Sequence, residues 1–536
     1  MIKPFSSAMR QIPVALSALA MATAAATAQT PLEEANTRWI NFETAETLPE
    51  KQFSFTVGSH QTIGAQNGTG NQMYYGAVDY GVTDDLQLGF SVQDFRDPIG
   101  PIAGMTEPTN LRSFGGNLKY RFVSGERLQA SALVSLEYYS FETSIFGTDV
   151  SDTDNLIGSF HVPLTYTLNP DLQFHLTPGV SVFPDSLNGF DYYGTVASLG
   201  AGVSWRASNR LLTFASVTAP LSGGNTIASD QSIQKELVFT AGARYNFTPK
   251  VALEGYVTNG FGTTPATGII TFMPEGDEPL FGLRLVYTPG QKLAYTYRQT
   301  PLAPVSQRGV RLDQDGFTVG SGRVMAPGSM RLGVSGGSDG NQAIMAAIAL
   351  ENDFQIEGII EDYSDDGSLT GADDPTPDAN RYMVGGRIRV LDQDNGSPFS
   401  WSLRALGGRS FGDGLVGVVY LATPASYDVN DRLTVHAEPK FFAFGDERVG
   451  GLGLGVNYEV FEGLQVIGEV TPVTDGRTAT WAVGARYDLP NGKWSVDASA
   501  TNAIGRYGHG TMVAQDDTRF AVGLSTRFNV SNLFGR

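Results

Sequence analysis

Apolar and polar residues alternate along most of this chain, in runs of about ten residues. In the run 236–247, apolar side chains at odd positions alternate with mostly polar ones at even positions. The runs 128–138 and 493–502 repeat this pattern. A period of two is typical of extended strands, whose successive side chains point to opposite faces. The chain is therefore predicted to be all-β, with strands that carry one apolar and one polar face.

Strand length and loop length together favour a membrane barrel. Strands of about 9 to 11 residues match a tilted membrane span. Short breaks alternate with longer polar loops, as in outer-membrane barrels, where the short side is periplasmic. The short breaks are 83–85, 124–127, 169–171, 207–209 and 248–250, and the loops are 96–111, 143–154, 184–191, 221–234 and 262–278. A secreted β-sandwich array or β-rich adhesin stays open as the soluble alternative.

The chain also repeats itself. Gly-Ala-Arg-Tyr occurs at 242–245 and again at 484–487, and six further segments recur in the same order along the two copies. The spacing between matching positions falls steadily along the chain, which indicates one ancestral unit in two copies with shorter loops in the second. Each copy holds about twelve strand candidates.

Two transmembrane antiparallel architectures fit this duplication: two barrels of about twelve strands in tandem, or one of about 24. A lead-in repeated before each copy favours two barrels. The predicted organisation is a signal peptide at 1–28, a periplasmic lead-in at 29–50, a first barrel repeat at 51–290, a connector at 291–328 and a second barrel repeat at 329–536.

The N-terminal residues resemble a cleaved secretory signal. Lys3 and Arg10 precede the short apolar run 12–22, and Ala26-Thr27-Ala28 is a small-x-small cleavage pattern. The chain has no cysteine, so a lipid anchor on cysteine and a disulfide are both excluded. The expected location is the cell outer membrane, with its lipid as the immediate partner.

Composition argues against several function classes. The formal net charge of −19 disfavours a nucleic-acid partner. The five histidines show no metal-ligand spacing, and we find no nucleophile elbow or phosphate-binding loop. We therefore expect no catalytic residue, no metal and no cofactor, and we predict that the protein is not an enzyme.

Basic side chains gather on the polar faces, which would line the lumen of a barrel. The lumen candidates are Lys119, Arg121, Arg244, Arg387, Arg389, Arg404 and Arg486, with the matched pair His175 and His436. Acidic residues concentrate in loops instead, notably 361–378 and 273–278. Such a lumen would favour anionic solutes or an anionic polymer. In the alternative interpretation, these cations pair with inward acids such as Glu254, Glu357 and Asp497 and fill a narrow barrel.

The mature chain resembles Gram-negative outer-membrane β-barrels. Each copy ends in Gly-x-x-x-x-aromatic, at Gly282–Tyr287 and Gly523–Phe528, similar to the terminal strand signal read by the barrel assembly machinery. Residues 529–536 follow that signal here, which departs from the pattern.

The lead-ins LPEKQFSFTVGS and APGSMRLGVSGGS resemble the start of YjbH-type barrels, which are linked to exopolysaccharide secretion, although the first lacks glycine after Pro49. This resemblance implies polysaccharide export.

Three functions remain from the sequence. The first is a porin-like channel for anionic solutes or for polysaccharide export. The second is a non-conducting structural or surface-interaction barrel with acidic extracellular loops. The third is a secreted soluble β protein.

Overall fold

The computed structural model describes the chain from residue 36 to residue 530, with gaps. The described ranges are 36–62, 71–104, 108–143, 145, 153–208, 210–247, 250–289, 312–351, 353–363, 381–410, 417–444, 447–474, 476–490 and 493–530. The predicted signal peptide lies outside these residues, as does most of the acidic loop 361–378.

Twelve antiparallel strands form the first barrel. They are β3 (Phe53–Thr62), β4 (Met73–Thr83), β5 (Leu86–Pro98), β6 (Pro108–Ser124), β7 (Leu128–Glu142), a broken strand made of β8 (Asp154–His161) and β9 (Leu164–Asn169), β10 (Leu172–Val182), β13 (Thr195–Arg206), β14 (Leu211–Pro220), β17 (Val238–Asn246), β18 (Val251–Thr258) and β19 (Leu280–Tyr287). The sheet closes where β19 pairs with β3, from Leu280 opposite Thr62 to Tyr287 opposite Phe55.

The second barrel repeats this plan. Its strands are β20 (Ser329–Gly337), β21 (Gln342–Glu351), β22 (Phe354–Asp362), β23 (Arg381–Leu391), β24 (Ser400–Ser410), a broken strand made of β25 (Gly417–Ala422) and β26 (Ala425–Asp428), β27 (Leu433–Phe444), β28 (Glu447–Phe461), β29 (Leu464–Thr471), β30 (Thr480–Asp488), β31 (Trp494–Ala503) and β32 (Ala514–Asn529). Closure runs through β20 and β32, from Ser329 opposite Asn529 to Gly337 opposite Ala521. The prediction of two tandem barrels is therefore confirmed, and the single barrel of about 24 strands is not formed.

Both barrels are apolar outside and polar inside. Outward side chains such as Leu136 and Phe520 are 59% and 65% exposed. Inward positions on the same strands hold buried Glu137 and Arg519. A soluble barrel would have the opposite arrangement, because water favours polar surface and the interior favours apolar packing. The described barrels are therefore built to face lipid, as transmembrane barrels are.

The broken strand has a matching cause in both barrels. Pro163 lies between β8 and β9, and Pro424 lies between β25 and β26. Proline has no N–H to donate to the ladder, so pairing is interrupted at that residue. The carbonyl group of each proline still accepts a hydrogen bond from the neighbouring strand, from Ser131 in the first barrel and Ser402 in the second, both at 3.0 Å. The break is thus a feature that both barrels share.

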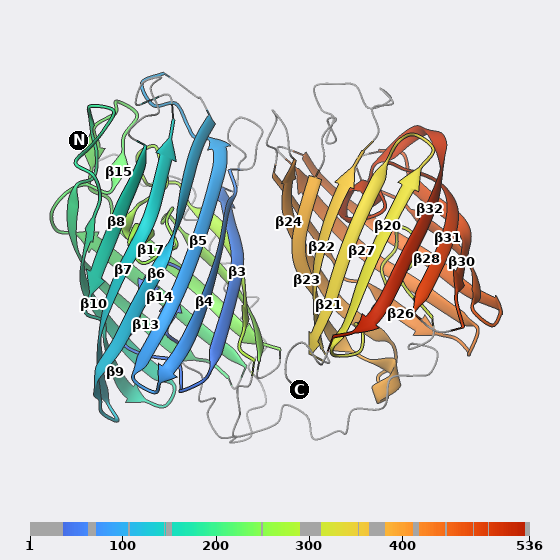
Figure 1. Ribbon diagram of the computed structural model, residues 1–536, viewed down its shortest axis with the longest axis horizontal. Helices are drawn as coiled ribbons and strands as arrows, with labels where there is room; N and C mark the ends of the chain where they lie inside the picture. The colour runs from blue at the N-terminus through green and yellow to red at the C-terminus, as the bar shows by residue number, and fades with distance from the viewer. Residues whose placement is uncertain are drawn as a thin grey trace.

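The two barrels lie side by side (Figure 1), and described contacts join them at both ends. At the long-loop end, the Tyr74 hydroxyl donates to the carbonyl oxygen of Gly408, and Arg409 forms an ion pair with Asp97. At the short-turn end, Val251 packs with Phe354 and Ile388 of the second barrel.

Both lumens are filled. Residues 36–48, which include the short strands β1 (Arg38–Trp39) and β2 (Phe42–Glu43), lie inside the first barrel and are named the first plug. Residues 312–325 lie inside the second barrel and are named the second plug. The sequence placed these residues in a periplasmic lead-in and a connector. The structure places their described parts in the lumens, where polar chain satisfies the inward polar side chains.

The long-loop end of each lumen is closed by chain that folds inward. After β18, residues 259–273, with the short helix η4 (Thr267–Ile269), are buried against Glu137, which accepts a hydrogen bond from the Ala266 amide at 2.9 Å. After β31, residues 503–513, with η6 (Gly508–Met512), form the inward loop of the second barrel, and the Arg506 and Tyr507 amides donate to Glu361. Apolar clusters pack around both segments.

Candidate functional site: the plugged lumens

The first plug is anchored by an aromatic side chain and an ion pair. The Trp39 indole is fully buried, with ring centroids 4.6 Å from His175 and 5.4 Å from Phe214. The Lys119 ammonium lies 2.8 Å from the Glu43 carboxylate. Burial alone would raise the pKa of Glu43, but Lys119 and Arg38 hold it below its usual range. The first plug therefore combines apolar packing with an ionised carboxylate.

A buried carboxylate between two guanidiniums supports this plug from the wall. Glu254 on β18 forms ion pairs with Arg244 on β17 and Arg284 on β19. The two arginines then reach the plug: Arg244 donates to the Asn36 side-chain oxygen at 2.9 Å, and Arg284 donates to the Arg38 carbonyl oxygen at 3.1 Å. Each guanidinium thus joins wall and plug.

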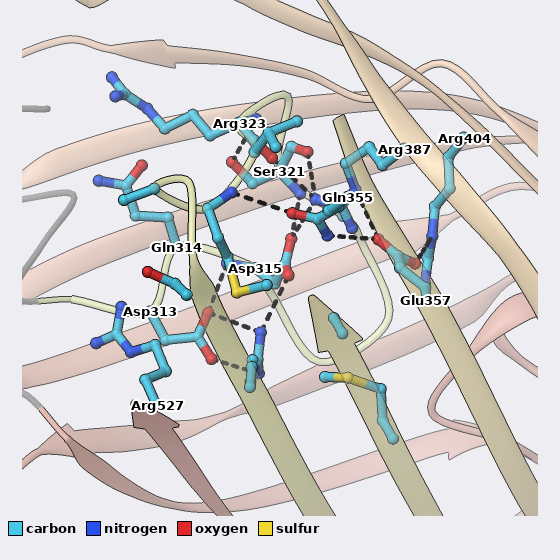
Figure 2. Close-up of a pocket in the computed structure, with 18 of the residues that line it drawn as sticks. Asp313, Gln314, Asp315, Ser321, Arg323, Gln355, Glu357, Arg387, Arg404 and Arg527 are labelled. Carbon is cyan, nitrogen blue, oxygen red and sulfur yellow. Dashed lines mark hydrogen bonds and ion pairs between the residues drawn. The ribbon is translucent and has the colours of Figure 1, made fainter. Parts of the chain in front are cut away.

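The second plug is held mainly by charge. Both of its carboxylates meet one wall guanidinium, because Arg331 Nη1 lies 3.1 Å from Asp313 Oδ1 and 3.1 Å from Asp315 Oδ2. Arg387 lies 3.0 Å from Asp315 and 3.1 Å from Glu357 of the wall (Figure 2). Burial alone would raise the pKa of Asp315, but Arg387 and Arg331 hold it well below its usual range.

Backbone contacts complete the docking of the second plug. Glu469 on β29 accepts hydrogen bonds from the Phe317 amide at 2.9 Å and the Thr318 amide at 2.7 Å. Arg486 donates to the carbonyl oxygens of Asp315 and Gly316. These wall residues hold the plug along its length by polar groups.

The two plugs dock in the same way, which the sequence pattern did not reveal. The Leu48 amide donates to Gln87 at 3.0 Å, and the Met325 amide donates to Gln355 at 3.0 Å. A second pair of matching wall positions also binds plug backbone. The Thr177 hydroxyl donates to the Glu43 carbonyl oxygen at 2.8 Å, and Glu438 accepts a hydrogen bond from the Gly320 amide at 2.9 Å. The two barrels therefore share the docking of their plugs as well as their strand order.

The matched histidines take part in this docking. The Ala45 amide donates to Thr165 Oγ1 at 3.1 Å, and that hydroxyl lies 2.9 Å from His175 Nδ1. In the second barrel, the Gly322 amide donates to Ser426 Oγ at 2.8 Å, and that hydroxyl lies 2.8 Å from His436 Nδ1. A hydroxyl that accepts from the plug has its own proton left to donate to the histidine. Each histidine thus orients a hydroxyl that holds the plug.

Removing this hydroxyl should loosen one plug only. We expect Ser426→Ala to weaken docking of the second plug by about 1–2 kcal/mol, because it leaves a buried amide without its acceptor. Hydrogen exchange at Gly322 should then quicken by about 5- to 30-fold, with no change at Ala45. Thr165→Ala is the matched variant and should have the reverse pattern. Equal exchange at Gly322 in Ser426→Ala and the wild type would contradict the role given to this hydroxyl.

All nine lumen candidates have described inward or rim positions, but they fall into two groups. Arg121 and Arg389 lie at the short-turn end, where they pair with Asp85 at 2.9 Å and with Asp392 at 2.7 Å. The others lie inside the lumens. Five of them contact a plug directly: Lys119, His175, Arg244, Arg387 and Arg486. His436 reaches the second plug through the Ser426 hydroxyl, and Arg404 shares the Glu357 carboxylate with Arg387. The pairings with Glu254, Glu357 and Asp497 are present as well.

The plug side chains themselves were missed by the sequence reasoning. Trp39, Glu43, Asp313 and Asp315 lie in segments without strand alternation, so no face could be assigned to them. The one available signal was that a lead-in of similar style precedes each copy.

A cavity of about 370 Å³ lies beside the second plug. It is bounded by the plug, by wall residues such as Arg387 and Glu357, and by residues of the short-turn end such as Asp394, Lys493 and Asn529. A cavity among plug and wall residues of the first barrel is much smaller, about 40 Å³. Of these two cavities, the one beside the second plug is the larger.

Among the described residues, no cluster of three or more His, Asp or Glu side chains is arranged to hold a metal ion. A search of the same residues for helices finds none with the length and apolarity of a membrane span.

Comparisons with known proteins give no family. No family model and no characterised protein matches the sequence. Among solved structures, the match to the siderophore receptor PirA from Pseudomonas aeruginosa spans 90% of this chain and 81% of the receptor chain, with 9% identity and a TM-score of 0.24. The match to the KdgM porin spans 44% of this chain and 98% of the porin chain, with 8% identity and a TM-score of 0.27. The match to the NanC porin also spans 44% of this chain and 98% of the porin chain, with 9% identity and a TM-score of 0.29. Likenesses this distant assign no function, and the resemblance to YjbH-type barrels stays a prediction.

Proposed function

We propose that the protein is an outer-membrane double barrel of porin type, in which the second barrel is a gated passage for anionic solutes. The first barrel is its closed companion. The observation that carries this proposal is the second plug, a polar segment held in a basic lumen by ion pairs and hydrogen bonds beside a cavity of about 370 Å³.

The charge of the cavity supports an anionic solute. Its lining has eight basic and five acidic side chains, although the whole chain carries a net charge of −19. Withdrawal of the second plug would remove Asp313, Asp315 and Arg323, which leaves seven basic and three acidic side chains. Basic linings draw anions into a pore.

The two plugs differ in how readily they could leave. The first plug buries Trp39, Ile40 and Phe42 against wall aromatics. Extracting it would expose this apolar surface to water. The second plug also buries Phe317 against Ile467 and Ala482, but no aromatic cluster like that around Trp39 holds its described residues. Its carboxylates and backbone dock through ion pairs and hydrogen bonds, which water and solute ions can replace. The gate is therefore assigned to the second barrel.

The outer membrane is the location that suits closed barrels with an apolar outer surface. Polysaccharide export is a narrower form of the proposal. It is supported by the lead-in resemblance alone, whereas the cavity has the size of a small solute.

A non-conducting structural pair is the second candidate. It is favoured by the inward-folded chain and the apolar clusters that close both long-loop ends. In that case the basic lumen residues only pair with acids and fix the plugs.

Bilayer recordings on full-length protein distinguish the two. We expect low conductance from the wild type and stable, anion-selective steps from a variant lacking both 312–323 and the inward-loop residues 505–512. The variant lacking 312–323 alone should conduct less than that double variant, and one lacking residues 36–46 should resemble the wild type. Each protein must first show the heat-dependent gel mobility of a folded barrel. Folded double-deletion protein without conductance steps would establish the structural function instead.

Acid should open the gate rather than close it. Because Asp315 has a lowered pKa when docked, its pairing stabilises the plug above the ordinary aspartate pKa of about 4 and is lost as pH falls further. In protein lacking residues 505–512, we expect similar open times at about pH 7 and 5, and longer ones at about pH 3. Asp315→Asn should remove this change. Opening between pH 7 and 5 would contradict the assignment, since it would point to a group with a higher pKa.

A further inference from the structure

The geometry points to a solute class: we propose that the arginines around Asp313 and Asp315 bind small solutes with two or more carboxylates, in competition with the second plug. The inference rests on the proposed function, for which it names the substrate. The plug carboxylates stand where the carboxylates of such a solute would bind.

Two carboxylates converge on this group of guanidiniums. Arg331 contacts both Asp313 and Asp315, each at 3.1 Å, through Oδ2 in the case of Asp315. Arg387 lies 3.0 Å from the other carboxylate oxygen of Asp315, Oδ1 (Figure 2). The side chains of both arginines are less than a tenth exposed. A planar guanidinium matches the planar carboxylate in shape and in hydrogen-bond spacing. This part of the wall is therefore arranged for two neighbouring carboxylates.

The adjoining cavity gives a solute room to reach these groups. Asp313, Asp315, Arg331 and Arg387 all line it, and its volume of about 370 Å³ lies within the range of small-molecule sites. Lining residues such as Lys493 belong to the short-turn end, so the cavity extends from that end to the arginines. A solute can thus meet the guanidiniums while the plug is still docked.

Glu357 restricts what can bind. It pairs with Arg387 at 3.1 Å and with Arg404 at 2.7 Å, so part of the basic charge is already neutralised by the wall. A monocarboxylate could replace only one plug carboxylate, and a neutral solute could replace neither. A solute with two or three carboxylates can replace both at once.

Competition with a tethered segment sets the affinity. The plug is part of the same chain, so it competes at an effective concentration of the order of millimolar. Weakening the plug should therefore tighten solute binding. Arg387 pairs with the plug as well, so its removal should weaken solute binding clearly once Asp315 has been replaced and no longer competes for it. Variants that were only destabilised would not bind the solute more tightly in one case and more weakly in the other.

Calorimetric titration of full-length, detergent-solubilised protein with citrate tests this, at constant ionic strength. We expect Asp315→Asn to bind citrate several-fold more tightly than the wild type. Adding Arg387→Gln to Asp315→Asn, where the plug no longer forms an ion pair with Arg387, should weaken citrate binding about tenfold relative to Asp315→Asn alone, the loss of one charged hydrogen bond. Arg121→Gln, at the rim of the first barrel, should match the wild type. Acetate and sucrose should bind no variant measurably.

Two results would overturn the inference: citrate affinity equal in the wild type and Asp315→Asn, or citrate heats no larger than those of acetate. Binding is measured without conductance, so the two proposals can fail separately. Citrate binding with the expected variant pattern, together with a silent double-deletion protein in bilayers, would uphold the site and reject the passage. Conductance of the double-deletion protein without citrate binding would uphold the passage and reject the site.

Discussion

A disulfide between plug and wall is expected to shut the second barrel reversibly. Ser321 Oγ of the plug lies 3.2 Å from Ser426 Oγ of the wall, so Ser321→Cys with Ser426→Cys brings two sulfurs within bonding reach. The chain has no cysteine of its own, so no other pairing can form. The bond would tie the plug to the wall at its docked position.

The measurement needs a background in which the plug is the remaining barrier. In protein lacking residues 505–512 and carrying Asp315→Asn, we expect the oxidised double-cysteine variant to be silent in bilayers and reductant to restore conductance. Each single-cysteine variant should conduct whether oxidised or reduced, which controls for the loss of the Ser426 hydroxyl. Conductance that is the same before and after reduction would show that the ion path does not pass the second plug.

Loss of one buried carboxylate should strongly destabilise the first barrel. Glu254 is fully buried and is the shared partner of Arg244 and Arg284. Glu254→Ala would leave two buried guanidiniums without their carboxylate, and breaking a buried pair in this way costs about 3–5 kcal/mol. We expect a matching fall in the free energy of unfolding of the first barrel, measured by urea titration of Trp39 fluorescence in a protein whose other tryptophans are replaced.

The control for this change is a carboxylate on the surface. Glu50→Ala removes the partner of Lys51, whose side chain is 78% exposed, and should leave the unfolding midpoint close to that of the wild type, because water screens exposed ion pairs. Unfolding midpoints that coincide for Glu254→Ala and the wild type would contradict the role assigned to the triad. The acid response of the second barrel should be unchanged by Glu254→Ala, because its plug contacts are separate.

The candidate site shows how far side-chain alternation can be trusted. Arg244 and Arg486 were assigned to the lumen from period-two alternation, and both are buried there. Their partners on the next strand, Glu254 and Asp497, could also be proposed, because hairpin neighbours are close in sequence. Asp315 could not be linked to Arg387, since 72 residues separate them and no local pattern relates a plug to a wall.

The sequence by itself determined the strands and their lipid and lumen faces, because side-chain period is a local property of the chain. Only the tertiary structure decided where each sheet closes, since β19 meets β3 across more than 200 residues of chain. It also decided that the segment before each barrel enters the lumen. That placement depends on charges and hydrogen-bonding groups from several strands, which come together only when the barrel has closed.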